Sequence, residues 1–343
     1  MIPSLKVAVL AGGRSSERDV SIASGESVLA GLLEAGHEAQ LIRVDAEGVW
    51  TLDGSEVALV PGKGIPGFDV AFPVMHGPYG EDGTLQGLLE SLRIPFVGSG
   101  VAASAICLDK ILAKQRLDQE GVAQVDYVGL TAGDWAERRE AVLAASRTLG
   151  SPVWVKPARL GSSVGITRVD DPSSDQLPAA IETALAHDPR VIIEESCTGR
   201  EVEVSVIEKV DEQGRVSLVL SPAGEITLPG AAEGEWYDYA RKYEAGGMEL
   251  VVPAQLAEEQ SALLAETVGR AFRALGCEGY SRVDTFVDGD RVLINEINTS
   301  PGFTQTSVFS SLFAADGRAY PDILDELLAT ALARAEREAQ HTF

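Results

Sequence analysis

The sequence predicts an α/β protein with a parallel sheet in its first part and a mainly antiparallel sheet in its last part. Short apolar strands alternate with helical segments over the first hundred residues, which is typical of a parallel sheet with crossover helices. From about residue 197, strands follow one another without long helices, which indicates antiparallel pairing. Because 343 residues exceed what one hydrophobic core usually serves, we divide the chain into three domains: 1–100, 101–196 and 197–343.

The first domain begins with a strand, a glycine loop and a helix. Residues 5–10 form a short apolar run that ends at a Gly-Gly pair, and residues 19–36 carry apolar side chains at helical spacing. Residues 69–74 and 94–97 predict further strands, with a helix that begins near Thr84 between them. These elements indicate a parallel sheet.

The second domain combines a helix with a strand and a phosphate-type loop. The helix starts near Ala102 and carries Asp109 and Lys110, and the strand covers residues 153–156. The strand is followed by Gly-Ser-Ser-Val-Gly at 161–165, whose backbone N–H groups and small side chains are suited to phosphate. A P-loop NTPase is disfavoured because G-x-x-x-x-G-K-[ST] is absent.

The third domain is predicted as α+β. Strands are expected at 201–208, 216–220, 282–287 and 292–297, and helices at 263–275 and 324–332. The glycine-rich stretch 224–247 is irregular, which for a compact domain indicates a functional lid loop.

The charge of the chain excludes several classes of partner. Fifty-two acidic residues against 28 basic ones give a net charge of −24, which disfavours nucleic acid and anionic membranes.

No apolar window is long enough for a membrane helix, and the N-terminus reads as a strand and loop, so we expect a cytoplasmic protein. The three cysteines and four histidines lack metal-site spacing, so any metal must be held by oxygen; we expect the cysteines to be free, buried thiols.

The strongest chemical feature is a set of oxygen-bearing side chains, Asp284, Glu296 and Asn298. With a three-residue turn at 288–290, Asp284 is expected opposite Ile294 and diagonal to Glu296, and all three oxygen donors share one face. Two carboxylates and an amide oxygen suit Mg²⁺. The same pattern fits an acidic solvent-facing hairpin, and spacing alone leaves both interpretations open.

Lysines and one histidine occupy distinctive settings. The chain has seven lysines and 21 arginines, and Lys110, Lys156 and Lys242 each stand in a motif-like segment. Lys156 ends an apolar strand, where an unpaired ammonium would be costly. Each lysine singly fits a surface charge, but together with a magnesium set they indicate ATP. His76 lies in a loop between a strand and a helix, where a ligand-binding and a structural role are both open.

The loop after the first strand also lies where α/β proteins bind ligands. It reads Gly-Gly-Arg-Ser-Ser-Glu-Arg at 12–18 and includes Glu17. A dinucleotide-binding turn is disfavoured because G-x-G-x-x-G is absent. Glu17 and Arg18 also fit an ordinary solvated first helical turn.

Taken together, these segments resemble the D-alanine–D-alanine ligase family of ATP-grasp enzymes, which act in bacterial cell-wall synthesis. The matching stretches are GGRSSERDVS (12–21), HGPYGEDGTLQG (76–87), VGSG (97–100), LDK (108–110), VKPARLGSSVG (155–165), EVEV (201–204), WYDYARKY (236–243), RVD (282–284) and NEINTSPGFTQTS (295–307). Nine collinear matches over almost the full length are highly specific.

The resemblance implies an ATP-grasp fold that holds ATP between the second and third domains. It implies that Lys110 and Lys156 contact the phosphates and that Lys242 reaches the γ-phosphate from the lid. The backbone of 194–197, with Glu194, Glu195 and Cys197, would form the adenine hinge, and Glu201 would bind the ribose. The further cofactor-binding and metal residues implied are Ser162 for the nucleotide, and Asp284, Glu296 and Asn298 for two Mg²⁺ ions, with Mn²⁺ as an alternative ion.

The resemblance also implies how D-alanine is bound and activated. Glu17 would bind the ammonium of the first D-alanine and form a hydrogen-bonded triad with Ser162 and Tyr243. Ser307 would bind the carboxylate of the second D-alanine, and His76 is a further substrate-binding candidate. Arg282 and the N–H of Gly302 would stabilise the tetrahedral intermediate.

The product and assembly follow from the same resemblance. The implied reaction gives D-alanyl-D-alanine, ADP and phosphate through a D-alanyl phosphate, in a homodimer formed through the N-terminal domain. Tyr243 favours the dipeptide. Ala240-Arg241 replaces a Glu-Ala pair of the family's lid, and the hinge residues 195–197 lack the larger side chains often found there in the family. The alternatives are a D-alanine–D-lactate or D-alanine–D-serine ligase, and a catalytically silent nucleotide-binding relative.

Overall fold

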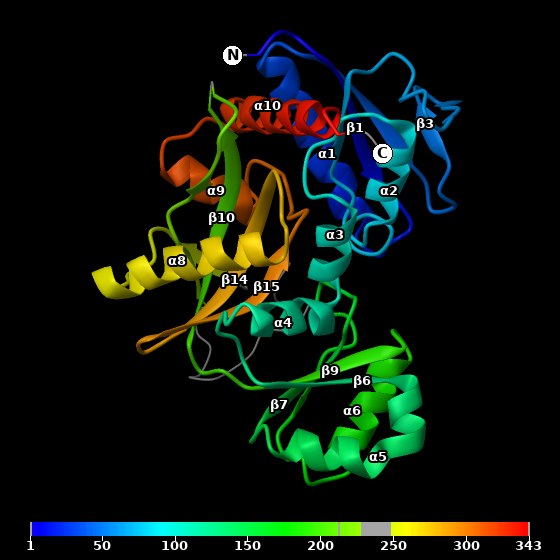
Figure 1. Ribbon diagram of the computed structural model, residues 1–343. Coiled ribbons are helices and arrows are strands. Elements are labelled where there is room, and N and C mark those ends of the chain that lie inside the picture. Colours follow the sequence, from blue (N-terminus) through cyan, green and yellow to red (C-terminus); the bar gives the residue numbers. More distant parts are fainter. Residues whose placement is uncertain (1, 212, 228–247, 342–343) are drawn as a thin grey trace.

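The described part of the protein contains three β-sheets that follow one another along the chain (Figure 1). The computed structural model describes residues 2–211, 213–227 and 248–341. In this part of the chain one sheet lies within residues 6–73, one within 127–195 and one within 200–298. The predicted α/β class is confirmed, and the proposed domain boundaries stay predictions.

The first sheet is parallel at its centre and antiparallel at one edge. β1 (Lys6–Gly12) pairs in parallel with β2 (Glu38–Val44) and β5 (Val70–Pro73), and it is buried from Val7 onward, as expected for a strand covered on both faces. The short strands β3 (Trp50–Leu52) and β4 (Ser55–Glu56) extend the sheet in antiparallel pairing, which the sequence did not indicate.

Helices flank this sheet as predicted, but one expected strand is missing. α1 (Arg18–Glu34) and α2 (Thr84–Leu92) match the predicted helices. The strand predicted at 94–97 is wrong, because this segment makes only a single bridge from Phe96 to Ala71. Arg93 ends α2 in a left-handed conformation with φ 60°, and the chain bends again at 97–98.

The second sheet is a four-stranded antiparallel layer. Its order is β6 (Tyr127–Thr131), β9 (Arg190–Glu195), β7 (Val153–Pro157) and β8 (Thr167–Val169), which confirms the predicted strand at 153–156. α5 (Ala132–Arg147) and α6 (Gln176–Leu185) pack on it, at the lower end of the molecule in Figure 1.

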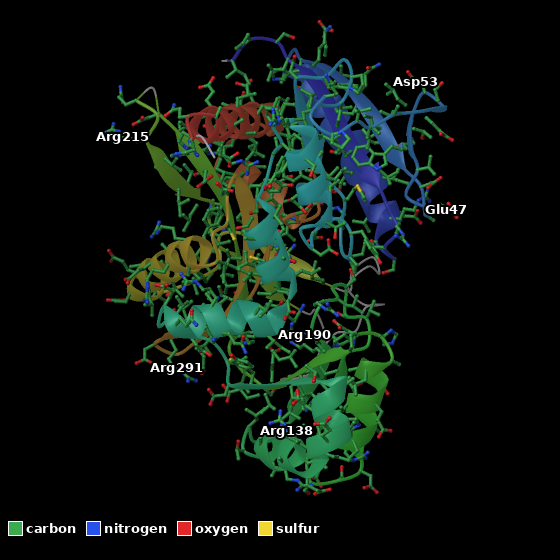
Figure 2. All side chains as sticks on the ribbon, turned by 45° about the vertical axis from the view of Figure 1, so that its right-hand side comes forward. Glu47, Asp53, Arg138, Arg190, Arg215 and Arg291 are labelled. Carbon is green, nitrogen blue, oxygen red and sulfur yellow. The ribbon has the colours of Figure 1, made fainter. Side chains whose placement is uncertain are left out.

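The helix predicted from Ala102 through Lys110 is two helices, α3 (Val101–Leu108) and α4 (Lys110–Gln119). Asp109 breaks the path because its carboxylate accepts hydrogen bonds from the N–H groups of Ile111 and Leu112, at 3.1 and 3.2 Å, as an N-cap. The carboxylate of Asp109 also lies 3.1 Å from the guanidinium of Arg190 of β9. Figure 2 labels Arg190 at the place where the second sheet meets the rest of the molecule.

The third sheet is antiparallel throughout, as predicted. Its path is β13 (Glu249–Val251), β12 (Gly224–Thr227), β10 (Arg200–Val210), β14 (Tyr280–Asp288) and β15 (Arg291–Asn298), and β11 (Val216–Leu220) also pairs with β10. The predicted lid at 224–247 is wrong in its first four residues, which form β12; residues 228–247 lie outside the described part of the chain.

Three helices accompany the third sheet in the described residues, and two of them connect it to the first region. α8 (Glu258–Ala274) buries its apolar face against β10, β14 and β15. α9 (Val308–Ala315) and α10 (Tyr320–Glu338) share one core with β1 and α1, so the two ends of the chain are packed together. Among the described residues no helix is long and apolar enough to cross a membrane.

Candidate active site

Two loops far apart in the sequence meet through Glu17 and Ser162. Glu17 stands directly before α1, and the Ser162 hydroxyl donates a hydrogen bond to its carboxylate. A Cβ on Gly77 would lie 2.6 Å from a Glu17 oxygen, which is closer than real contacts allow. The glycine therefore leaves room for this carboxylate, and the loops after β1, β5 and β7 converge on it.

The β14–β15 hairpin brings the three predicted oxygen donors together, but in a different register. Asp288 pairs with Arg291 across a two-residue turn, and a bulge next to Asp284 shifts the pairing so that Asp284 faces Glu296 directly. The predicted pairing of Asp284 with Ile294 is wrong for this reason, since Thr285 takes that place. Because of the bulge, Asp284 and Glu296 lie directly opposite each other and not diagonally, as predicted from the spacing.

Arg282 organises the carboxylates at this end of the hairpin. Its Nε and Nη2 atoms donate to both oxygens of Asp284 at 2.7 Å, and Nε lies 2.9 Å from Glu203. The Nδ2 atom of Asn298 donates to Asp284 at 3.0 Å. Burial lowers the pKa of Arg282, but Asp284 and Glu203 outweigh it and raise the pKa above its usual value. Arg282 is therefore a fixed positive charge.

Lys110 joins the hairpin to the Gly-Ser loop. Its ammonium lies 3.2 Å from Glu296 and donates to the carbonyl of Leu160 at 3.0 Å. The side chain is 13% exposed, so this cation stands at the boundary between protein and solvent. The predicted phosphate lysine and the predicted metal carboxylate are thus neighbours.

Lys156 is paired with a buried carboxylate, as its position at the end of an apolar strand requires. Its Nζ atom donates to Glu194 at 2.5 Å, and Lys114 lies 3.2 Å from the other oxygen of Glu194. Burial would raise the pKa of Glu194, but Lys156 and Lys114 lower it to about 2. Glu194 is therefore ionised at neutral pH, between two ammonium groups.

We expect Glu194 to contribute acid-sensitive stability. Its pKa falls from 4.5 to about 2 on folding, so its contribution, on the order of 3 kcal/mol, is complete above pH 4.5 and is lost as the pH falls toward 2. Urea unfolding of the wild type and Glu194→Gln at several pH values should show a stability difference that shrinks below pH 4.5. A difference that stays constant with pH would contradict this. Glu182→Gln, in an exposed pair with Arg139, is the control and should change little.

The predicted adenine hinge forms the link between the second and third sheets. β9 ends at Glu195 and β10 begins at Arg200, so only residues 196–199 connect them. The Glu195 carboxylate accepts from the N–H of Asp126 at 3.0 Å, and Cys197 accepts from the N–H of Gly199 at 3.3 Å. Cys197 is partly exposed, so the prediction that all three cysteines are buried is wrong for it.

Glu201 lies further along the same link, on β10. It is half-buried and pairs in register with Phe286 of β14. Burial lowers the pKa of Lys156, but the carboxylates of Glu194, Glu296 and Glu201, in that order, outweigh it and raise the pKa, so Glu201 lies near the predicted phosphate lysine. Its predicted ribose contact stays a prediction.

His76 links the loop after β5 to the segment that follows β15. Its Nδ1 donates to the carbonyl of Ser300 at 2.8 Å, because a carbonyl only accepts, and its Nε2 therefore accepts from Ser24 at 3.1 Å. Ser24 in turn accepts from the N–H of Phe303 at 3.1 Å. Burial lowers the pKa of His76, which favours the neutral ring. Both ring nitrogens are bonded within the protein, and the ring positions residues 300–303; direct contact with substrate stays a prediction.

Glu81 is a carboxylate in the same loop whose side chain is 13% exposed. It accepts from the N–H of Gly77 at 2.8 Å and lies 3.8 Å from Nδ1 of His76. Burial, and then the negative charge of Glu17, raise the pKa of Glu81 to about 8. Glu81 is therefore mostly protonated at neutral pH.

Ser307 and Gly302 lie together at the start of α9. The Ser307 hydroxyl accepts from the N–H of Thr304 at 3.0 Å, and a Cβ on Gly302 would lie 3.2 Å from that hydroxyl. The two predicted residues therefore share one turn, which His76 and Ser24 hold against α1.

The structure thus assembles most of the predicted site from separate parts of the chain. Two predicted residues, Lys242 and Tyr243, lie outside the described residues. Lys114, Glu81 and Glu203 are polar groups of the site that the sequence reasoning missed. Only Lys114 carried a readable signal, because it is one of seven lysines and follows Lys110 by four residues in a helix.

Family models match both parts of the chain. The model described as "D-ala D-ala ligase C-terminus" matches residues 117–329, and "D-ala D-ala ligase N-terminus" matches residues 6–65 and 59–99. Together they cover the three sheets described above.

Similar proteins agree with these matches. D-alanine–D-alanine ligases of Mycolicibacterium smegmatis and Deinococcus radiodurans are 41% and 39% identical, over 96% and 95% of this chain and 96% and 98% of theirs. The VanG D-Ala:D-Ser ligase from Enterococcus faecalis is a similar solved structure, with a TM-score of 0.82, 31% identity, and coverage of 96% of this chain and 99% of that one. The D-alanine-D-alanine ligase from Coxiella burnetii has a TM-score of 0.82, 28% identity and 98% coverage of both chains. The chain therefore has the ATP-grasp fold and belongs to the D-alanine–D-alanine ligase family.

Proposed function

We propose that the protein joins two D-alanines to D-alanyl-D-alanine, with ATP converted to ADP and phosphate, for peptidoglycan precursor synthesis. The observation that carries this proposal is the convergence of Glu17 and Ser162 with the Arg282–Asp284 pair and the phosphate lysines in a member of this ligase family. A carboxylate that can hold an ammonium, fixed cations and oxygen donors are what a carboxylate–amine ligase requires.

The described lysines are suited to hold the nucleotide. The side chains of Lys110 and Lys156 are 13% and 16% exposed, and Lys110 contacts the carbonyl of Leu160 directly before the loop at 161–165. We assign them to the ATP phosphates, with Ser162 in the same loop. The hinge at 194–197 would take the adenine through its backbone, Glu201 the ribose, and Lys242 the γ-phosphate.

The residues at the hairpin fit a divalent cation. Among the described side chains no three His, Cys, Asp or Glu groups form a metal-ligand set, so the amide oxygen of Asn298 is needed beside Asp284 and Glu296. The carboxylates of Asp284, Glu296 and Glu203 face the cations Arg282 and Lys110, so the local charge is 2 − 3 = −1. Bound Mg²⁺, as two ions, would neutralise charge on the phosphate oxygens; Mn²⁺ is the alternative ion.

The order of steps follows from these positions. Glu17 orients the first D-alanine through its ammonium, so that a carboxylate oxygen attacks the γ-phosphorus and ADP leaves, giving a D-alanyl phosphate. The amine of the second D-alanine, held through its carboxylate at Ser307, then attacks the acyl carbon. Arg282 and the N–H of Gly302 stabilise the oxyanion, and phosphate leaves as HPO4²⁻ with one proton from the nitrogen, while the other proton of the former ammonium passes to solvent. Tyr243 would complete the triad with Glu17 and Ser162.

We expect Glu17→Gln to weaken binding of the first D-alanine. The variant keeps the hydrogen bond from Ser162 but removes the negative charge that faces the substrate ammonium, so the KM of the first site should rise about 30-fold. The KM for ATP should change less than about twofold. Steady-state kinetics with each substrate varied in turn checks this, and an equal rise in both KM values would contradict it.

The reaction is tested by product analysis with a panel of substrates. ADP release is measured with Mg²⁺-ATP and D-alanine alone, with D-alanine plus D-lactate or D-serine, and with L-alanine, and the products are identified by mass. D-alanyl-D-alanine from D-alanine alone is the expected result. Ligation only with D-lactate or D-serine would assign the chain to a relative with another second substrate, and ATP binding without turnover would indicate a silent relative.

We further propose a cytoplasmic homodimer that associates through the N-terminal domain. The proposed domains are 1–100, 101–196 and 197–343, with a lid in the last of them. Soluble D-alanine and ATP are the proposed partners, without nucleic acid or membrane, which agrees with the net charge of −24.

A further inference from the structure

Helix α4 presents two lysines to the nucleotide side of the molecule. Lys110 and Lys114 are four residues apart, so they lie on the same face of the helix. Lys110 contacts Glu296 and the carbonyl of Leu160, at the mouth of the site. Lys114 lies behind it and is only 2% exposed. The second lysine thus cannot serve as an ordinary surface charge.

Lys114 is held by groups from two other elements. Its ammonium lies 3.2 Å from Glu194 of β9, donates to the carbonyl of Val125 at 3.4 Å, and stands 5.5 Å from the centre of the Tyr127 ring. Glu194 is 3% exposed and has its second oxygen on Lys156. The three side chains form a buried row, Lys114–Glu194–Lys156, whose open end is the 16% exposed Lys156.

The charges of this row determine whether the Lys156 ammonium can move toward a nucleotide phosphate. One carboxylate stands between two ammonium groups, so the row has a net charge of +1. Without Lys114, Glu194 would be neutralised by Lys156 alone, and a buried ion pair resists separation because each ion would lose its counter-charge. Drawing Lys156 toward a nucleotide phosphate would then leave a buried carboxylate unpaired. With Lys114 present, that carboxylate keeps a partner.

We propose that Lys114 is a positioning residue for ATP: it neutralises Glu194 so that the Lys156 ammonium is available to the nucleotide phosphates. This inference rests on the proposed function, in which Lys156 contacts those phosphates. It assigns to Lys114 an effect on nucleotide affinity without contact with the nucleotide.

The first test is Lys114→Met, which keeps the chain length and removes the charge. We expect the KM for ATP to rise about tenfold while the KM for D-alanine changes less than about twofold. Calorimetry gives a readout besides activity: the Kd of ADP should rise about tenfold, and that of adenosine, which has no phosphate, less than about twofold. A merely structural role would weaken ADP and adenosine alike, and that outcome overturns the proposal.

A double variant separates charge balance from packing. In Lys114→Met combined with Glu194→Gln, the carboxylate that holds Lys156 is also removed, so the Kd of ADP should return to within about threefold of the wild type. A double variant no better than Lys114→Met overturns the proposal. Lys114→Arg retains the charge and should stay within about threefold of the wild type; a tenfold loss in it would also count against the proposal.

Two further choices keep the test decisive. If Lys114→Met is insoluble, Lys114→Gln, which keeps an N–H donor for Glu194, should show the same tenfold rise, and its absence overturns the proposal. The control variant is Lys209→Met, an exposed lysine paired with Glu326, which should leave both Kd values unchanged. If the wild type forms no ADP that depends on D-alanine, the proposed function is refuted. If the wild type is active and Lys114→Met binds ADP as tightly as the wild type, only this inference is refuted.

Discussion

Asp284→Asn should lower kcat about 1,000-fold, with little loss of fold, because it removes a full charge from the proposed metal set while preserving shape. The side chain is 3% exposed and contacts Arg282 and Asn298. Asparagine can still accept one hydrogen bond from Arg282, and Arg282 keeps Glu203 as a counter-charge. The fall in kcat should therefore come from weaker charge neutralisation at the phosphate oxygens and not from a loss of fold.

Phosphate release under saturating ATP and D-alanine measures this effect, with the thermal midpoint as the check on folding. The matched control is Asp290→Asn in the turn of the same hairpin, where the residue is exposed. Asp290→Asn should retain activity within about twofold, since an exposed turn carboxylate contributes little. Activity of Asp284→Asn within tenfold of the wild type at saturating Mg²⁺ would remove Asp284 from the metal set.

Arg282→Lys should lower kcat about 100-fold with unchanged nucleotide affinity, because a lysine ammonium cannot reproduce the forked contacts of the guanidinium. Arg282 holds both oxygens of Asp284 and one of Glu203. The arginine therefore has two roles that the variants separate: a fixed positive charge for the oxyanion and a counter-charge for two buried acids.

Arg282→Met tests the second role. It leaves Asp284 and Glu203, 3% and 4% exposed, without this cation, and should destabilise the protein by about 3–5 kcal/mol in urea unfolding. Arg282→Lys should lose much less stability. If Arg282→Lys retained wild-type kcat, the proposed stabilisation of the oxyanion would be wrong.

The sequence predicted the chemistry of the hairpin better than its geometry. Residue types and a period of two were enough to place Asp284, Glu296 and Asn298 on one face, because alternation is a local property of strands. The register was wrong because a bulge and a two-residue turn together move Asp284 opposite Glu296. A bulge depends on how the strands pack, and a single chain of residue types does not show it.

Burial, helix capping and long-range packing explain the other differences between the predicted and the observed structure. The spacing of Lys114 from Lys110 indicates a shared helix face, but only the tertiary structure shows that Lys114 is enclosed beside Glu194. The break between α3 and α4 was readable in principle, since aspartate is a favoured N-cap, but apolar spacing on both sides suggested one helix. The core that α10 shares with β1 and α1 joins residues some 300 positions apart, which periodicity does not reveal.

The central claim, ligation through a D-alanyl phosphate, is tested most directly by oxygen transfer. The protein is incubated with Mg²⁺-ATP and D-alanine labelled with ¹⁸O in its carboxylate, and phosphate and product are analysed by mass. If the carboxylate attacks the γ-phosphorus, one of its two ¹⁸O atoms appears in the released phosphate per turnover, and the other stays in the carbonyl of the new amide. Unlabelled phosphate alongside D-alanyl-D-alanine would contradict the account.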